Sequence, residues 1–218
     1  MGAAVVNERN ERNKRNGTNG RNGRNGQGEP QEQGEPEQRG GRRYAVSGGP
    51  SAGNPPLVVV MGVSGSGKTT VGERLAERLG LAFAEADDFH PPANAAKMAA
   101  GTPLADADRW PWLDAIAGWL ARHAPEGGVV SCSALRRSYR DRLRRTAPGL
   151  FFLHLAGSEE LIARRLADRT GHFMPRSLLR SQFETLEPLA PGERGATVDV
   201  AGPAAEVTAR AVRAVRGA

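Results

Sequence analysis

Short apolar runs alternate with amphipathic segments from about Pro55 to the end of the chain. Five runs have the length and composition of buried strands: LVVVM (57–61), LAFAEA (81–86), GGVVSCS (127–133), GLFFLHLAG (149–157) and ATVDVAG (196–202). Such runs, separated by longer segments, are typical of a parallel sheet whose strands are joined by helices.

The connecting segments have helical spacing. Val71, Leu75 and Leu79 recur at four-residue intervals before Gly80, which predicts a helix over Thr69–Leu79 with a glycine stop. Ser158 is a capping residue ahead of a later helix, and a last helix is predicted from Pro203. Two further helices are predicted from apolar faces, formed by Trp112, Leu113, Ile116, Trp119 and Leu120 and by Leu135, Tyr139 and Leu143.

The pattern therefore predicts an α/β fold: three α/β/α layers around a central parallel sheet of about five strands, in one domain over residues 55–218. Ligands of such sheets bind beyond the carboxyl ends of the strands. We expect the residues that follow Met61, Ala86, Ser131 and Leu155 to surround the active site.

Residues 1–54 have a different composition. Between Asn7 and Gly53 the large apolar residues are Tyr44 and Val46, and Asn-Gly recurs every third residue from Asn16 to Gly26. Such a segment cannot bury enough apolar surface to offset its ordering entropy. We expect a disordered low-complexity tail; a collagen-like structure is excluded because the run is short and lacks proline.

Charge and cysteine content exclude several classes of function. The net charge is +6, but the tail's nine basic residues and six glutamates supply about half of this excess, and its acids are interspersed. A solvated tail is favoured over a nucleic-acid contact. Cys132 is the only cysteine, which excludes an intrachain disulfide and a multi-cysteine metal site. Without an apolar leader or a stretch that could span a bilayer, we expect a soluble, cytoplasmic protein with no membrane contact.

GVSGSGKTT, at residues 62–70, fits the phosphate-binding pattern G-x-x-x-x-G-K-[ST] and lies between a predicted strand and a predicted helix. In such a P-loop, successive backbone N–H groups and the helix dipole hold nucleotide phosphates. Lys68 is expected to reach the β and γ phosphates, and the Thr69 hydroxyl to bind Mg²⁺. The predicted ATP-binding residues are Gly62, Val63, Ser64, Gly65, Ser66, Gly67, Lys68, Thr69 and Thr70.

The carboxylate that usually helps to hold the metal in P-loop proteins is not at its usual place. The strand at 127–133 ends in Ser131, Cys132 and Ser133, so it carries no Walker-B acid. The nearest candidates are Glu85, Asp87 and Asp88, after the second strand. These acids suit contacts with a metal and an acceptor hydroxyl, although a solvated acidic turn explains them equally well.

His90, Lys97 and Arg109 lie in a segment too rich in Pro and Ala to be a simple crossover. A histidine and two cations suit a small, anionic, hydroxyl-rich acceptor. Each residue also has a simpler interpretation. His90 precedes Pro91 and could be a turn residue, Lys97 could lie on a solvated face, and Arg109 could pair with Asp106.

A third cluster, RRLADRTGHFMP, holds Arg164, Arg165, Arg169 and His172 around a glycine. Arginines that converge on a transferring phosphoryl group stabilise its charge, and a glycine permits a lid to close. The alternative is a basic helix end that complements the helix dipole. Most arginines of ALRRSYRDRLRR are expected on an exposed helix face, with Arg137 and Arg140 singled out as candidates for the site.

Together these stretches resemble the small P-loop gluconokinases, relatives of shikimate and nucleoside-monophosphate kinases. The matching stretches are MGVSGSGKTT, DFHPPANAAKMAAGTPLADADRWPWL, CSALRRSYRDRLR and GHFMPRSLLRSQFETLEPL, in order over nearly all of Leu57–Leu189. The resemblance implies transfer of the γ-phosphoryl group of ATP to the 6-hydroxyl of D-gluconate, which feeds the pentose phosphate or related routes. It also implies Mg²⁺, a helical acceptor-binding insert and an arginine-bearing lid, and such families lead us to expect a homodimer.

The resemblance also implies roles for individual residues. Asp87 would orient, and help to deprotonate, the acceptor hydroxyl, and Glu85 would contact Mg²⁺, through water because it is longer than the aspartate of related kinases. Gluconate would be bound by His90, Lys97, Arg109 and Ser133, with Gln182 closing the acceptor side. The lid would contribute Arg165, Arg169 and His172, the two arginines acting in catalysis with Lys68 and Asp87.

Other functions stay open on the sequence. The same fold supports shikimate and nucleotide kinases, although the strand at 127–133 ends in Ser-Cys-Ser-Ala where shikimate kinases are expected to carry three glycines. From a different class, the chain could be a nucleotide-dependent binding module whose tail contacts RNA.

Overall fold

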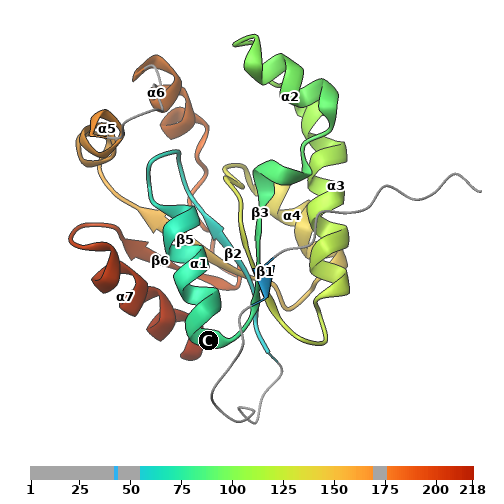
Figure 1. Cartoon of the computed structure of the whole chain (residues 1–218), viewed down its shortest axis with the longest axis vertical. Helices are drawn as coiled ribbons and strands as arrows, with labels where there is room; N and C mark the ends of the chain where they lie inside the picture. The colour runs from blue at the N-terminus through green and yellow to red at the C-terminus, as the bar shows by residue number, and fades with distance from the viewer. Residues whose placement is uncertain (1–41, 44–54, 169–175) are drawn as a thin grey trace, which may run out of the picture. The chain divides into compact units, whose positions relative to one another are not determined.

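The computed structural model describes residues 42–43, 55–168 and 176–218 (Figure 1). All of these residues belong to one compact unit, residues 38–218. The predictions for residues 1–41, 44–54 and 169–175 lie outside the described residues. Among the described helices, none is long and apolar enough to cross a membrane.

A central sheet contains five parallel strands in the order β3 (Ala82–Glu85), β4 (Gly128–Ser131), β2 (Leu57–Met61), β5 (Phe151–Ala156) and β6 (Gly195–Asp199). All five were predicted from the apolar runs, within a few residues of their observed bounds. A short strand, β1 (Arg42–Arg43), pairs antiparallel with β3. This strand lies in the segment predicted to be disordered, and its pairing could not be read from two arginines.

The helices of the described residues are α1 (Lys68–Leu79), α2 (Pro92–Ala99), α3 (Asp106–Arg122), α4 (Arg137–Thr146), α5 (Glu159–Ala167), α6 (Arg176–Thr185) and α7 (Ala204–Arg216), with a 3₁₀ turn, η1, at Ala86–Phe89. Two predicted helix ends are confirmed. Gly80 ends α1 in a left-handed conformation (φ 66°), and the Ser158 hydroxyl caps α5 by accepting a hydrogen bond from Leu161 N at 3.2 Å.

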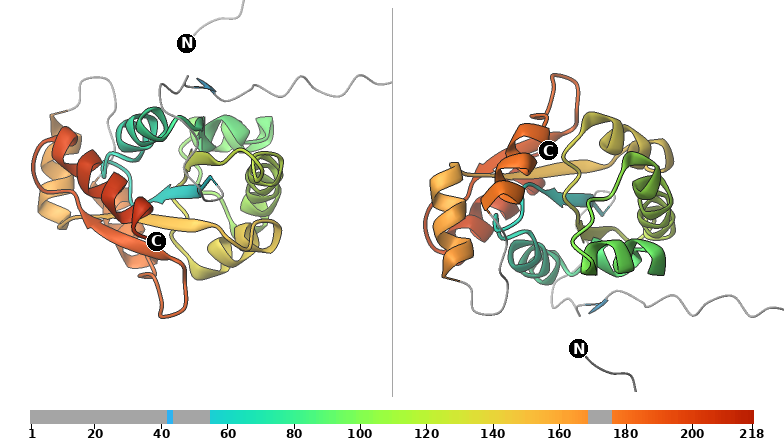
Figure 2. Two further views of the ribbon diagram at one scale, coloured as in Figure 1. Left: turned by 90° about the horizontal axis from the view of Figure 1, so that it is seen from below. Right: turned by 90° about the horizontal axis from the view of Figure 1, so that it is seen from above.

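Helices cover both faces of the sheet, as Figure 2 shows from two sides. Successive side chains of β2 point to opposite faces. Val58 and Val60 pack in a core cluster with residues of α1 and α7, whereas Val59 and Met61 pack in another with residues of α3 and α4. The predicted three-layer α/β/α architecture is therefore confirmed.

The carboxyl ends of the parallel strands meet at one edge of the sheet. The loop 62–67 follows β2, η1 follows β3 and the segment 132–136 follows β4. In Figure 1, α2 and α6 both lie beyond this edge. The topology thus brings together the segments in which the sequence placed its candidate residues.

Candidate active site

The glycines of the loop 62–67 permit a backbone path that other residues could not follow. Gly62 and Gly65 have φ values of 140° and 80°. A Cβ atom on Gly62 would lie 2.7 Å from Leu155 O, and one on Gly65 would lie 2.7 Å from Leu166 Cγ. The loop is therefore packed tightly against β5 and α5, and α1 begins directly after it at Lys68.

Two backbone N–H groups of this loop donate to distant segments. Gly62 N donates to Ser133 O at 3.3 Å, and Ser64 N donates to Gln182 Oε1 at 2.7 Å. Lys68 Nζ donates to Val63 O at 3.0 Å. The loop is thus held by the segment after β4 and by α6, and the lysine amine contacts its first half.

Thr69 and Glu85, the two residues that the sequence suggested for the metal, lie side by side. The Thr69 hydroxyl donates to Glu85 Oε2 at 2.7 Å. Glu85, the last residue of β3, is paired in register with Ser131 of β4, so it lies beside the strand end where the sequence lacks an acid. Burial raises the pKa of Glu85, and the Thr69 hydrogen bond opposes this effect. The pair suits Mg²⁺, because the Thr69 hydroxyl donates its hydrogen bond to the Glu85 carboxylate, which leaves the hydroxyl lone pairs for the ion.

Asp87 lies in η1, close to this pair. The charges of Asp87 and Lys68 both act on the pKa of Glu85, in opposite directions. The Asp87 side chain is exposed, and its carbonyl accepts a hydrogen bond from His90 N at 3.3 Å. The structure therefore brings the predicted nucleotide, metal and hydroxyl-orienting residues together.

His90 stacks on Trp112 of α3, with ring centroids 4.6 Å apart and planes 8° from parallel. Trp112 Nε1 donates to Ala86 O at 2.7 Å, which fixes the orientation of the ring on which His90 stacks. Burial, more than the opposing charge of Asp87, lowers the pKa of His90, so the ring is neutral near pH 7. Asn94 Nδ2 lies 3.4 Å from His90 Nδ1. With Nδ1 as the acceptor, Nε2 carries the proton and can donate to a ligand oxygen.

Lys97 and Arg109 are each paired with an acid of the same segment. Lys97 Nζ lies 2.6 Å from Asp108 Oδ1, with 44% of its side chain exposed, and Arg109 Nη1 lies 3.4 Å from Asp106 Oδ1. The simpler interpretation of Arg109, a pair with Asp106, is thus observed. It does not exclude a ligand, because these partly exposed pairs are weak enough to exchange partners.

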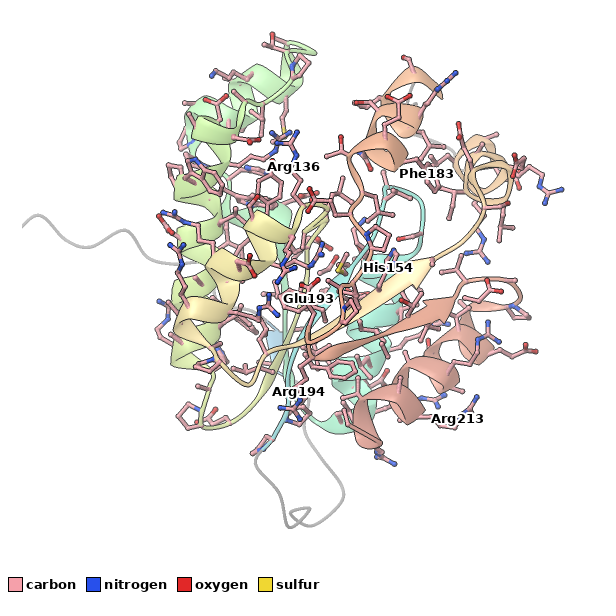
Figure 3. The ribbon with its side chains drawn as sticks, turned by 180° about the vertical axis from the view of Figure 1, so that it is seen from behind. Arg136, His154, Phe183, Glu193, Arg194 and Arg213 are labelled. Carbon is pink, nitrogen blue, oxygen red and sulfur yellow. The ribbon has the colours of Figure 1, made fainter. Side chains whose placement is uncertain are left out.

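Asp106 is the centre of a cluster of which sequence reasoning gave only the contact with Arg109. It accepts hydrogen bonds from Tyr139 Oη at 2.6 Å and from Arg136 Nη1 at 2.8 Å, and the first of these contributes most to lowering its pKa. The guanidinium groups of Arg109 and Arg136 each lie 5.9 Å from the Tyr139 ring centroid. Figure 3 labels Arg136, at the start of α4. A carboxylate ligand would therefore find two arginines that share one acid.

Comparison with known proteins identifies the family. A family model described as an AAA domain matches residues 57–189. A gluconokinase from Gluconobacter oxydans is 51% identical over 68% of this chain and 83% of its own length. The thermosensitive gluconokinase of Escherichia coli is 44% identical over 72% of this chain and 86% of its own length. The chain belongs to the gluconokinase family.

A solved structure agrees with this membership. The crystal structure of a gluconokinase from Sinorhizobium meliloti superposes with a TM-score of 0.71 and 55% identity, covering 75% of this chain and 93% of that one. The family assignment and the predicted P-loop kinase fold are confirmed, and the protein is a kinase by family.

Not every predicted residue of this gluconokinase-family chain reaches the loop. Arg165 Nη2 donates to Val200 O at 2.6 Å and to Gly202 O at 3.0 Å, between β6 and α7. A phosphate contact would have to use its other nitrogens or exchange these bonds, so its role in catalysis stays a prediction. Arg169 and His172 lie outside the described residues. Ser133 is half-buried and contacts Gly62 through its carbonyl.

Arg140, one of the two arginines singled out from α4 as candidates for the site, has a structural role instead. It is fully buried and forms a bidentate ion pair with Glu193, with Nε–Oε1 at 2.8 Å and Nη2–Oε2 at 2.9 Å. The same guanidinium donates to the carbonyls of Ala134, Leu135, Glu187 and Pro188. Arg140 therefore joins the segment after β4 to the segment after α6, and does not itself face the P-loop.

The only cysteine also lies at this edge. Cys132 directly follows β4, is buried, and donates its backbone N–H to Val60 O at 3.0 Å. Burial raises the pKa of its thiol to about 12. At neutral pH the thiol is protonated, so it acts in packing rather than as a nucleophile.

Proposed function

We propose that the protein transfers the γ-phosphoryl group of ATP to the 6-hydroxyl of D-gluconate, giving 6-phospho-D-gluconate. The proposal is carried by one arrangement: Thr69 is hydrogen-bonded to Glu85, the charges of Lys68 and Asp87 lie near enough to act on the pKa of Glu85, and that of Asp87 acts on the pKa of His90. Membership of the gluconokinase family selects the acceptor.

On the phosphate side, the N–H groups of the P-loop hold the β and γ phosphates, and Lys68 leaves Val63 O to meet the transferring group. Thr69 would ligate Mg²⁺ directly and Glu85 through a water molecule. When bound, Mg²⁺ neutralises charge on the phosphate oxygens. Arg165, Arg169 and His172 are proposed to close over this group.

On the acceptor side, Asp87 orients the 6-hydroxyl in line with the γ phosphate and takes its proton. The His90 Nε2–H group donates to a hydroxyl of the sugar chain. Lys97 and Arg109, assisted by Ser133, bind gluconate, with a cation meeting its carboxylate at the expense of the present pairs with Asp108 and Asp106. A homodimer and a cytoplasmic location stay predictions.

The proposal is tested by ADP release from the purified protein with Mg·ATP and, separately, D-gluconate, shikimate, AMP and no acceptor. We expect turnover with gluconate alone. Turnover with shikimate or AMP would reassign the acceptor. Tight ATP binding without turnover on any of them would favour a nucleotide-dependent binding module.

The role of Asp87 has its own test. Asp87→Asn should lower kcat by about 10²-fold, because the amide can still accept a hydrogen bond but cannot take the proton. ATP affinity should stay nearly unchanged, as measured by fluorescence titration. Asp88→Asn is the matched control on the neighbouring exposed acid, and an equal loss in both variants would reject the assignment.

A further inference from the structure

Gln182 makes the contact between α6 and the P-loop, although 118 residues separate it from Ser64. Its side-chain atom 2.7 Å from Ser64 N must be the oxygen, because a backbone N–H can only donate. The amide nitrogen makes no hydrogen bond to a residue that the structure describes. The oxygen of Gln182 is therefore committed to the loop rather than to the acceptor.

The end of α6 that carries Gln182 is itself fixed to the segment after β4. Glu187 N donates to Leu135 O at 2.8 Å, and Glu187 Oε2 accepts from Arg137 N at 2.5 Å. The buried Arg140 donates to carbonyls on both segments. Phe183, labelled on α6 in Figure 3, packs against the core beside this end of the helix.

These contacts close a ring. The segment after β4 reaches the P-loop through Ser133 O and Gly62 N, and it reaches α6 through Leu135 and Arg140. Helix α6 then returns to the P-loop through Gln182 and Ser64 N. The first half of the loop is thus held at two peptide groups, two residues apart, by one connected body.

We propose that Gln182 is a positioning residue for phosphoryl transfer. Its Oε1 fixes the Ser64 peptide, so that the N–H groups from Gly65 onward keep the orientation in which they meet phosphate oxygens. Through Gln182, the shape of the loop depends on the placement of α6. This inference rests on the proposed kinase activity and moves Gln182 from acceptor binding to organisation of the P-loop.

The test combines kinetics with hydrogen exchange of the Ser64 amide, measured by NMR on the nucleotide-free protein. Gln182→Met keeps the length of the side chain and removes the acceptor. It should lower kcat about tenfold, leave the KM for gluconate within about twofold, and speed exchange of the Ser64 amide. Gln182→Glu retains an oxygen for Ser64 N–H and should keep that exchange slow.

Ser181→Ala is the matched control, because Ser181 is the exposed neighbour on the same helix. It should leave kinetics and exchange unchanged. If Gln182→Met does not fold, Gln182→Asn replaces it, since the shorter amide cannot reach Ser64 and predicts the same losses.

Two results would overturn the inference: unchanged Ser64 exchange in Gln182→Met, or a raised gluconate KM with unchanged kcat. The second would make Gln182 an acceptor ligand. Absence of turnover in the wild-type protein would instead reject the proposed function, and the exchange rates would still decide whether Gln182 holds the loop.

Discussion

The phosphate side of the site (residues 62–70 with Glu85) and the acceptor side (residues 87–109 with Arg136 and Tyr139) differ in what holds them. The P-loop is held by backbone contacts to Ser133 and Gln182 and by tight packing against Leu155 and Leu166. The cations of the acceptor side are instead paired with Asp106 and Asp108, at partly exposed positions.

This difference has a consequence for catalysis. Under the proposed function, a phosphate group would meet a loop backbone that is already fixed, with only a local exchange of the Lys68 bond to Val63 O, and such preorganisation stabilises the transition state. If Lys97 and Arg109 bind the acceptor as proposed, a sugar acid would have to displace Asp108 and Asp106, and part of its binding free energy would be spent on exchanging partners. Changes on the phosphate side should therefore act on kcat, and changes on the acceptor side on KM.

The largest effect is expected beneath the phosphate side, where Glu193→Gln leaves the buried Arg140 charge without its partner. We expect the free energy of unfolding at pH 7 to fall by about 3–5 kcal/mol. The Arg140 hydrogen bonds lower the pKa of Glu193 to about 2, so its contribution is complete above pH 4.5, the ordinary value, and is lost as the pH falls toward 2.

Urea titrations of wild type and Glu193→Gln between pH 3 and 8 measure this contribution. The difference in the free energy of unfolding between wild type and Glu193→Gln should be constant above about pH 5 and should become smaller below it. Glu184→Gln, which breaks the exposed pair with Arg180, is the control and should hardly move the curve. A difference that grows toward acid pH would contradict the assignment.

Lys68→Ala removes the cation that we propose meets the transferring group. We expect kcat to fall by on the order of 10²-fold or more, since a preorganised charge is lost in the transition state. A coupled assay of ADP release measures the loss, and thermal unfolding should show that the fold is retained. A variant that keeps wild-type kcat and has only a higher KM for ATP would contradict the expectation that changes on the phosphate side act on kcat.

Arg109→Ala tests the acceptor side. We expect the KM for gluconate to rise roughly tenfold with a smaller change in kcat, as for loss of a charge-assisted hydrogen bond. The comparison with Arg142→Ala, on the exposed pair with Asp114, controls for general charge. If gluconate KM held steady while ATP binding weakened, the acceptor site would have to be placed elsewhere.

Lys97→Ala should have the smallest effect, about a threefold rise in the KM for gluconate, because this lysine is the more exposed of the two cations. Initial rates at saturating ATP measure it. An effect larger than that of Arg109→Ala would make Lys97 the main partner of the substrate carboxylate.

The strand, loop and helix of the proposed phosphate side could be located from the sequence because that side is local. Strand, glycine loop, Lys68 and Thr69 lie within one unit of chain, and Glu85 follows from the end of the next strand. The pair between Arg109 and Asp106 was offered by the sequence, but the contact between Asp106 and Tyr139 could not be predicted, since Tyr139 was expected only as part of an apolar stripe and its hydroxyl meets an acid 33 residues away. The burial of Arg140 depends likewise on Glu193, which lies far along the chain.

The position of Cys132 makes its rate of chemical labelling a measure of local opening at this edge of the sheet. A thiol that is buried and protonated reacts with a thiol reagent only in molecules that have opened around β4, so the rate of labelling counts those openings. Because Cys132 is the only cysteine, no other cysteine has to be removed by mutation before the labelling is measured. A nucleotide bound to the P-loop would slow the labelling of Cys132. The ratio of the labelling rates without and with nucleotide would measure how strongly the occupied loop stabilises the end of β4 against opening.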